Sequence, residues 1–238
     1  MSDHIVKAYD NDLAALKSML SEMGGKAEDQ LAKSIDALIR RDTKLADSVV
    51  KADELLDQME AAIEEKAVLI VAKRQPMAKD LRNVMVAIRI AADIERIGDL
   101  AKNVAKRAHA IDSPIPRRLA TGLERMGQLA QTQLKLVLDA FAADDAARAM
   151  DVWRHDEDID ALYNSIFREL LTYMMEDPRM IGACTHLLFA TKNIERIGDH
   201  ATNIAENIYY QVHGELLKEL RPKNDLTSTT PFSIENRG

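Results

Sequence analysis

The chain contains one six-residue stretch twice without change. Ile94–Asp99, with the sequence IERIGD, returns as Ile194–Asp199 at an offset of 100. Earlier matches keep an offset of 103, as in Met23–Gly24 with Met126–Gly127. A nearly constant offset over so long a span indicates that one ancestral unit has been duplicated, so the fold should consist of two similar halves.

The composition favours packed helices. Aromatic residues make up only 4% of the chain, while Ala, Leu, Ile, Met and charged residues dominate. Such a composition is typical of helical proteins rather than of sheets. At 238 residues the chain is long enough for two modest domains, each with its own core. We therefore predict an all-α protein.

Charge and cysteine content exclude some classes of protein. A net charge of -7 argues against a general DNA or RNA binder, which needs a basic face to displace counterions. Cys184 is the only cysteine, so no internal disulfide can form. The first residues do not resemble a signal peptide, and no run approaches the ~20 apolar residues of a membrane span. We expect a cytoplasmic protein that can lie at the inner membrane through protein partners.

Apolar spacing and proline positions predict three helices in each half. The two prolines of Ser113–Pro116 mark the boundary, since proline is excluded from a helix interior. We expect the first helix to run through Gly24 and Gly25, at a cost of about 2 kcal/mol. The predicted helices are 5–40, 43–74, 77–108, 117–142, 145–176 and 178–220. The predicted units are a three-helix bundle at 1–112, a second at 117–220 and a flexible polar tail at 221–238.

Acidic residues recur four positions apart beside the apolar stripe of two helices in each half. At about 100° per residue, Glu95 and Asp99 fall at the edge of the apolar face of their helix. Arg89, Asp93 and Arg96 fall on the opposite, solvated side. The same edge position is predicted for the pairs on the other three helices, which are Asp53 and Asp57, Asp156 and Asp160, and Glu195 and Asp199.

Four carboxylates that converge between packed helices repel one another, so a cation is expected between them. Arg96 and Arg196 point away, which favours a bound ion, and oxygen ligands suit Mg, Mn or iron. The alternative interpretation is that these acids form ordinary solvated helix faces.

Two further pairs of equivalent residues lie close to these acids in the sequence. A glycine inside a helix costs about 1 kcal/mol relative to alanine, so Gly98 and Gly198 predict a close approach of neighbouring helices. Asn103 and Asn203 lie one turn beyond the hexamers and are weaker candidate ligands.

The segments around these acids resemble the signature segments of a known family. They are Gln75–Arg82 (QPMAKDLR), the hexamer Ile94–Asp99 and the stretch Asn193–Glu206 (NIERIGDHATNIAE). All three are similar to the PhoU family, the accessory regulators of bacterial phosphate uptake and phosphate-starvation signalling. The resemblance extends from about residue 5 to residue 215.

The resemblance implies two tandem three-helix bundles and multinuclear metal sites that hold iron or zinc. It also implies an adaptor that links the ATPase of the phosphate ABC transporter to a membrane sensor histidine kinase and restrains the kinase when phosphate is plentiful. We further expect a homodimer and no nucleic-acid partner. Carried over position by position, the implied metal ligands are Asp53, Asp57, Glu95, Asp99, Asp156, Asp160, Glu195 and Asp199.

A metalloenzyme is the competing interpretation, for instance a carboxylate-bridged di-iron oxidase or a two-metal phosphohydrolase. The chain has no Glu-x-x-His motif, no Gly-x-Ser-x-Gly elbow and no phosphate-binding glycine-rich loop. A purely structural bundle would leave the repeated acids unexplained. We therefore expect a regulator without catalytic residues.

Overall fold

The computed structural model describes the backbone of residues 2–219 and the side chains of residues 9–219. Over this part of the chain the structure is helical and contains no strand, which confirms the all-α prediction. The first half consists of α1 (Ser2–Arg40), α2 (Thr43–Arg74), α3 (Lys79–Lys106) and the short turn η1 (Arg107–His109). The second half consists of α4 (Arg117–Ala142), α5 (Ala146–Arg154), α6 (Asp156–Glu176), the short turn η2 (Pro178–Met180) and α7 (Ile181–His213).

Most predicted helix ends lie within three residues of those in the structure, and two predicted helices differ by more. The helix expected at 145–176 is divided into α5 and α6 at His155, whose backbone adopts φ -93 and ψ 14. The helix expected to reach residue 220 ends at His213, because Gly214 takes a left-handed conformation with φ 78 and its N–H donates to the Tyr210 carbonyl. Residues 221–238, for which we predicted a flexible tail, lie outside the described residues.

The first helices of the two halves make a reciprocal contact. Helix α1 runs unbroken through its two glycines, as predicted. A Cβ at Gly24 would lie 2.6 Å from the Cδ1 of Leu138, and a Cβ at Gly127 would lie 2.3 Å from the Cδ1 of Ile35. Gly24 corresponds to Gly127 and Ile35 to Leu138 at the same offset of 103. The two halves are therefore related by an approximate twofold arrangement.

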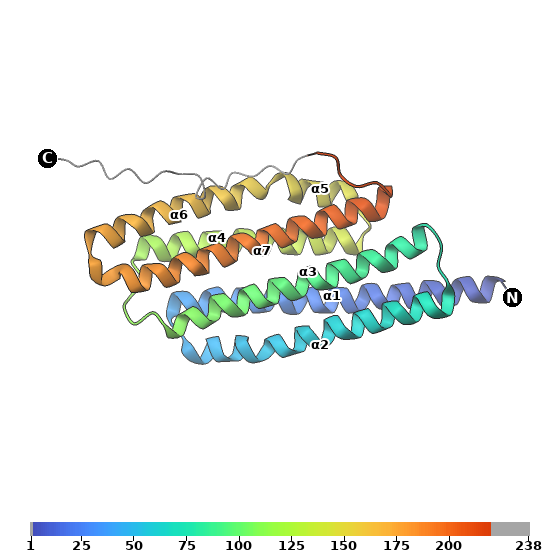
Figure 1. Ribbon diagram of the computed structural model, residues 1–238, viewed down its shortest axis with the longest axis horizontal. Helices are drawn as coiled ribbons and strands as arrows, with labels where there is room; N and C mark the ends of the chain where they lie inside the picture. Colours follow the sequence, from blue (N-terminus) through green and yellow to red (C-terminus); the bar gives the residue numbers. More distant parts are fainter. Residues whose placement is uncertain (1, 220–238) are drawn as a thin grey trace.

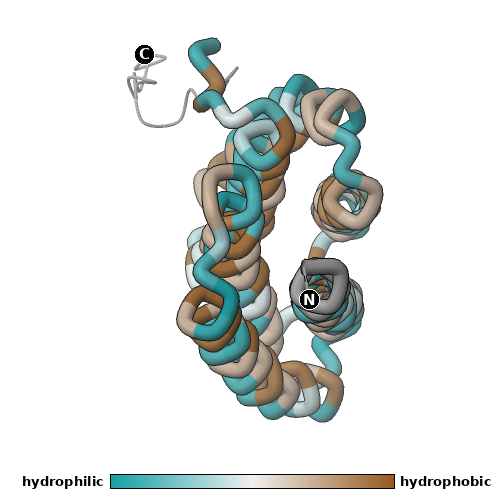
Figure 2. Tube along the Cα trace, turned by 90° about the vertical axis from the view of Figure 1, so that its right-hand side faces the viewer, coloured by the Kyte–Doolittle hydropathy of each residue, from teal (hydrophilic) through white to brown (hydrophobic). Residues whose placement is uncertain are grey.

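The helices form two layers. In Figure 1, α2, α3, α7 and the α5–α6 pair lie in front, with α1 and α4 behind them. Seen end-on in Figure 2, the front layer is curved and wraps around α1 and α4. The most extensive packing between the halves joins α3 to α7, and one buried apolar cluster runs through both halves. Each half therefore relies on the other to cover part of its core.

None of the helices within residues 2–219 is long and apolar enough to cross a bilayer.

Candidate functional site

The predicted acids of the first half lie where α2 and α3 pack together. Leu56 on α2 and Ile97 on α3 are buried, and the acids beside them lie at the margin of this contact. A Cβ at Gly98 would lie 2.3 Å from the Cδ1 of Leu56 and 3.5 Å from the Oδ1 of Asp53. The predicted close approach of helices at this glycine is therefore confirmed, and it holds the Asp53 carboxylate against α3.

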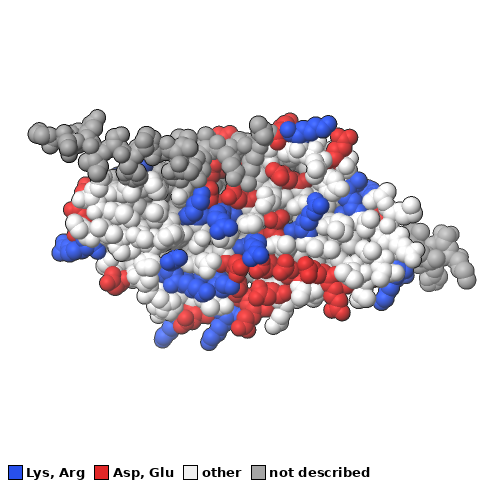
Figure 3. Space-filling model, viewed as in Figure 1, with Lys and Arg blue, Asp and Glu red and all other residues white. Residues whose placement is uncertain are grey.

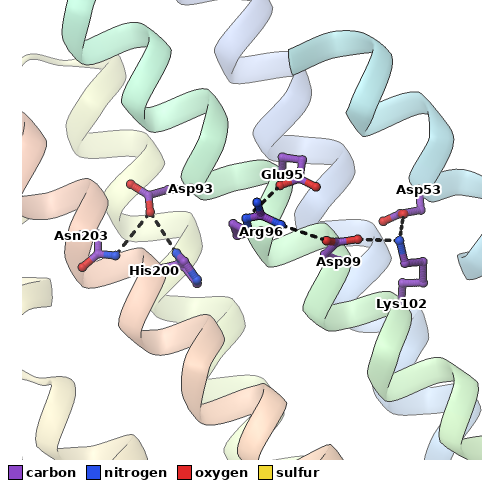
Figure 4. A network of polar contacts seen from close by, with 8 residues as sticks. All are labelled: Asp53, Asp93, Glu95, Arg96, Asp99, Lys102, His200 and Asn203. Atoms are coloured by element: carbon purple, nitrogen blue, oxygen red, sulfur yellow. Dashed lines mark hydrogen bonds and ion pairs between the residues drawn. The ribbon is translucent and has the colours of Figure 1, made fainter. Parts of the chain in front are cut away.

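A lysine that the sequence analysis did not select joins these two helices. The Nζ of Lys102 donates to the Oδ1 of Asp99 at 2.5 Å and also to the Oδ2 of Asp53 (Figure 4). Burial alone would lower the pKa of Lys102, but the hydrogen bonds to the two carboxylates outweigh it and raise that pKa above its usual value. The cation expected between the acids is thus, in the first half, a side chain of the protein.

Arg96 does not point away from the acids, contrary to our prediction. Its side chain is exposed, yet its Nε lies 3.5 Å from the Oε2 of Glu95 and its Nη1 lies 3.4 Å from the Oδ2 of Asp99. A helical wheel gives the direction of the Cβ, whereas the long arginine side chain can fold back along the helix surface. Figure 4 shows the guanidinium between the two carboxylates.

Glu95 is the acid of the first half whose titration is most altered. Burial, followed by the nearby charge of Asp99, raises the pKa of Glu95 to about 7, and Glu60 and Asp57 contribute in the same direction. Arg96 opposes the shift. Three predicted acids and Glu60 therefore share one electrostatic environment on the α2–α3 surface, where acidic side chains gather in Figure 3.

The corresponding acids of the second half are more deeply buried. Asp156, Asp160 and Glu195 are each about 95% buried, whereas Asp57, the counterpart of Asp160, is exposed. A Cβ at Gly198 would lie 2.7 Å from the Cδ1 of Ile159, so the second glycine also marks a close approach of helices.

The second half uses different polar partners. Position 202, which corresponds to Lys102, is a buried threonine whose Oγ1 donates to the Oδ1 of Asp156 at 3.1 Å. The Nζ of Lys192, a position that is alanine in the first half, lies 2.8 Å from the Oε1 of Glu195 and 4.9 Å from the centre of the Tyr163 ring. The ammonium group near the acids is therefore supplied from a different place on the helix.

Glu195 keeps one carboxylate oxygen without a donor. Its side chain is 5% exposed, and its Oε2 is buried with no hydrogen-bond partner. Burial is the main reason that the pKa of Glu195 is raised, and the nearby Asp199 adds to the shift. A buried acceptor of this kind is costly unless something positive reaches it.

The side-chain oxygen of Gln133 is a second buried acceptor without a donor, and it lies near Gly198. At the break between α5 and α6, the carbonyl of His155 accepts from the backbone N–H of Asp158 at 3.3 Å and from the Nε2 of Gln133 at 2.9 Å. The Oε1 of Gln133 has no hydrogen-bond partner and would lie 3.6 Å from a Cβ at Gly198. In the first half, Gln30 instead donates to the Oδ1 of Asp53 at 3.1 Å and to the carbonyl of Gly98 at 3.3 Å.

The two asparagines are not brought to the acids in the same way. Asn203 faces the other half, and its Nδ2 lies 3.4 Å from the Oδ1 of Asp93, while Asn103 is half-buried on α3. The Nδ1 of His200 lies 2.9 Å from the same Asp93 oxygen (Figure 4). Asp93 is therefore enclosed between α3 and α7, and the prediction that it is solvated was wrong.

Within residues 9–219, no group of three or more His, Cys, Asp or Glu side chains is already arranged to hold a metal ion. The second-half acids nevertheless fit a cation, because the buried Oε2 of Glu195 and Oε1 of Gln133 are both acceptors without a donor. The fit is opposed in the first half by the ammonium group of Lys102, which contacts two of the acids, and in the second half by the more exposed ammonium group of Lys192, which contacts Glu195.

Comparison with known proteins gives a consistent result. The family model of the PhoU domain matches the chain twice, at residues 20–108 and 123–208. The chain is 57% identical over 227 residues to the phosphate-specific transport system accessory protein PhoU homolog of Rhizobium meliloti (strain 1021), covering 95% of this chain and 96% of that protein. It is 53% identical over 229 residues to the protein of the same name from Caulobacter vibrioides (strain NA1000 / CB15N), covering 96% and 100%.

A solved structure shares the arrangement of helices. The crystal structure of PhoU from Pseudomonas aeruginosa superposes with a TM-score of 0.81 at 40% sequence identity. The match covers 87% of this chain and 100% of the other.

Proposed function

The chain belongs to the PhoU family, and from that premise we propose that it regulates phosphate uptake and phosphate-starvation signalling. In this role it is an adaptor that contacts the ATPase subunit of a phosphate ABC transporter and a sensor histidine kinase, and restrains the kinase when phosphate is plentiful. The observation that carries the proposal is the double match to the PhoU domain, together with relatives named as phosphate-specific transport accessory proteins over nearly their whole length.

The structure supports an adaptor better than an enzyme. The buried carboxylates between the helices are held in ion pairs with lysines, as in the contacts of Lys102 with Asp53 and of Lys192 with Glu195. The relatives are also named as accessory proteins.

The proposal includes bound metal, either iron or zinc, with Mn or Mg as alternatives. In the second half the ion would be held by Asp156, Asp160, Glu195 and Asp199, between α6 and α7, and the first-half ligand set remains a prediction. A bound ion would supply positive charge that links the two helices and stabilises one arrangement of the surface.

Regulation is tested in a bacterium whose own PhoU-family gene has been deleted. We expect expression of this chain to restore repression of a phosphate-starvation reporter in phosphate-rich medium. Leu56→Asp, which places a charge in the core, is the loss-of-fold control. If the reporter stays active although the folded chain accumulates, the proposed regulation is wrong.

Adaptor contact is tested with purified components. The chain should co-elute with the transporter ATPase and, separately, with the cytoplasmic part of the kinase. Sedimentation of the chain alone at several concentrations tests the expected homodimer. Absence of both complexes at micromolar concentration would contradict the adaptor role.

The competing metalloenzyme is tested by turnover. Metal-loaded protein would be assayed for oxidase and phosphatase activity beside Glu195→Gln. Metal-dependent turnover that this variant abolishes would support the enzyme over the adaptor.

A further inference from the structure

We infer that Lys102 is a built-in cation that takes the place of a metal ion in the first half, so that the chain binds its metal in the second half. This inference rests on the metal binding proposed above. It concerns which of two similar acid clusters is the stronger site.

The first-half cluster already holds a positive charge at the point where its helices meet. Lys102 reaches from α3 and contacts both Asp53 on α2 and Asp99 on α3 (Figure 4). Its side chain is 21% exposed, and Asp53 is 5% exposed, so water screens this ion pair only partly. A divalent ion that used these two carboxylates would have to displace the ammonium group and leave it beside the ion.

The second-half cluster lacks this lysine and retains two buried acceptors. Thr202 stands in its place and supplies a neutral hydroxyl to Asp156. The Oε2 of Glu195 and the Oε1 of Gln133 are buried without a donor. Carboxylate and amide oxygens are both ligands for hard metal ions, so each of these acceptors is of a kind that a cation can satisfy.

The lysine of the second half is a weaker competitor. Lys192 contacts Glu195 from the preceding turn of the same helix, and its side chain is 38% exposed, compared with 21% for Lys102. Its ammonium group also lies 4.9 Å from the centre of the Tyr163 ring, so an ion would have to displace it from these contacts, but its greater exposure leaves solvent within its reach. Binding of an ion would then require rotation of the acids toward one another, since they are not yet arranged around a common point.

The experiment is a titration of the full-length chain, stripped with a chelator, with Zn²⁺ in a calorimeter. Elemental analysis after gel filtration gives the stoichiometry. Wild type is compared with Glu95→Gln and Glu195→Gln, the equivalent changes in the two halves. We expect Glu195→Gln to weaken the tightest binding by about tenfold or more, and Glu95→Gln to leave it unchanged.

The decisive variant gives the first half the residue found in the second. Lys102→Thr should add Zn²⁺ binding that Glu95→Gln then removes. Lys106→Thr makes the same change one turn further along, at an exposed position, and should bind like wild type. Circular dichroism establishes that each variant is folded, and Lys102→Met is the substitute if the threonine variant is not.

Three results would overturn the inference. The first is equal weakening by Glu95→Gln and Glu195→Gln in the wild-type background. The second is a folded variant at position 102, whether threonine or methionine, that binds as wild type does. The third is the absence of Zn²⁺ binding by any variant, which would also refute the proposed metal binding but would leave the reporter test of regulation standing. Equal weakening by the two glutamate variants would refute the inference but leave the proposed metal binding standing.

Discussion

The two acid clusters share an identical hexamer and differ in what surrounds it. In the first half, a lysine from α3 joins Asp53 to Asp99, and Glu95 lies beside an exposed arginine. In the second half, the acids are more buried, and Glu195 and Gln133 each present an oxygen without a donor. The repeated motif therefore sets the positions of the carboxylates, while residues about one turn away determine which positive groups pair with them.

The largest effect is expected from removing the lysine of the first half. Lys102→Met should lower the free energy of unfolding of metal-free protein by about 3 kcal/mol, because the buried Asp53 loses its cation. Urea unfolding at neutral pH measures the change. Lys106→Met is the matched control and should cost less than about 0.5 kcal/mol.

A second variant separates lost pairing from lost packing. Asp53→Asn combined with Lys102→Met should recover much of the stability, because no buried charge is then left unpaired. If Lys102→Met costs no more than the control, the lysine does not stabilise the first-half cluster.

The next largest losses of stability are expected from substituting the two equivalent glutamines, Gln30 and Gln133. Gln30→Leu should cost about 2 kcal/mol, because its amide donates to the charged Asp53 carboxylate. Gln133→Leu should cost about 1 kcal/mol, because it loses a bond to the neutral carbonyl of His155 and also removes an unpaired oxygen. Urea unfolding of both variants in chelator tests the order, and a larger loss for Gln133→Leu would contradict it.

The smallest effect depends on pH. Because the pKa of Glu95 is about 7 in the folded chain and 4.5 is its ordinary value, the folded state holds the proton more tightly, and stability falls as the pH rises from 4.5 to 7. Glu95→Gln should therefore be more stable than wild type by about 1 kcal/mol at pH 8, allowing for partial exposure, and nearly equal to it at pH 4.5. Unfolding curves in chelator at both pH values test this, and a stability difference that does not change with pH would contradict it.

Much of the fold follows from the sequence because helix periodicity and proline positions act locally. The duplication, the unbroken α1 and the close approaches at Gly98 and Gly198 were all predicted correctly. A glycine kept twice inside a helix indicates packing, since only packing offsets its cost.

What the sequence did not reveal depends on side-chain reach and tertiary contact. Lys102 lies three residues after Asp99, which could have suggested an ion pair, but its bond to Asp53 depends on how closely α2 approaches. The helix break at His155 carries no proline or glycine. It is accompanied by contacts from other helices, including the bond from Trp153 to Glu206 at 2.9 Å and that from Gln133 to the His155 carbonyl.

The packing between the halves combines a symmetric contact with an asymmetric one. The contacts of Gly24 with Leu138 and of Gly127 with Ile35 are interchangeable, so a half paired with a copy of itself could make them equally well. The contact of Asp93 with His200 is not interchangeable, because the equivalent positions are Asn193 and Leu100. Two copies of the first half would set Asp93 against leucine.

The Asp93–His200 contact therefore favours pairing of the first half with the second over pairing of the first half with a copy of itself. The ion pair of Lys17 with Asp144 acts in the same direction, because Arg41 is the first-half counterpart of Asp144.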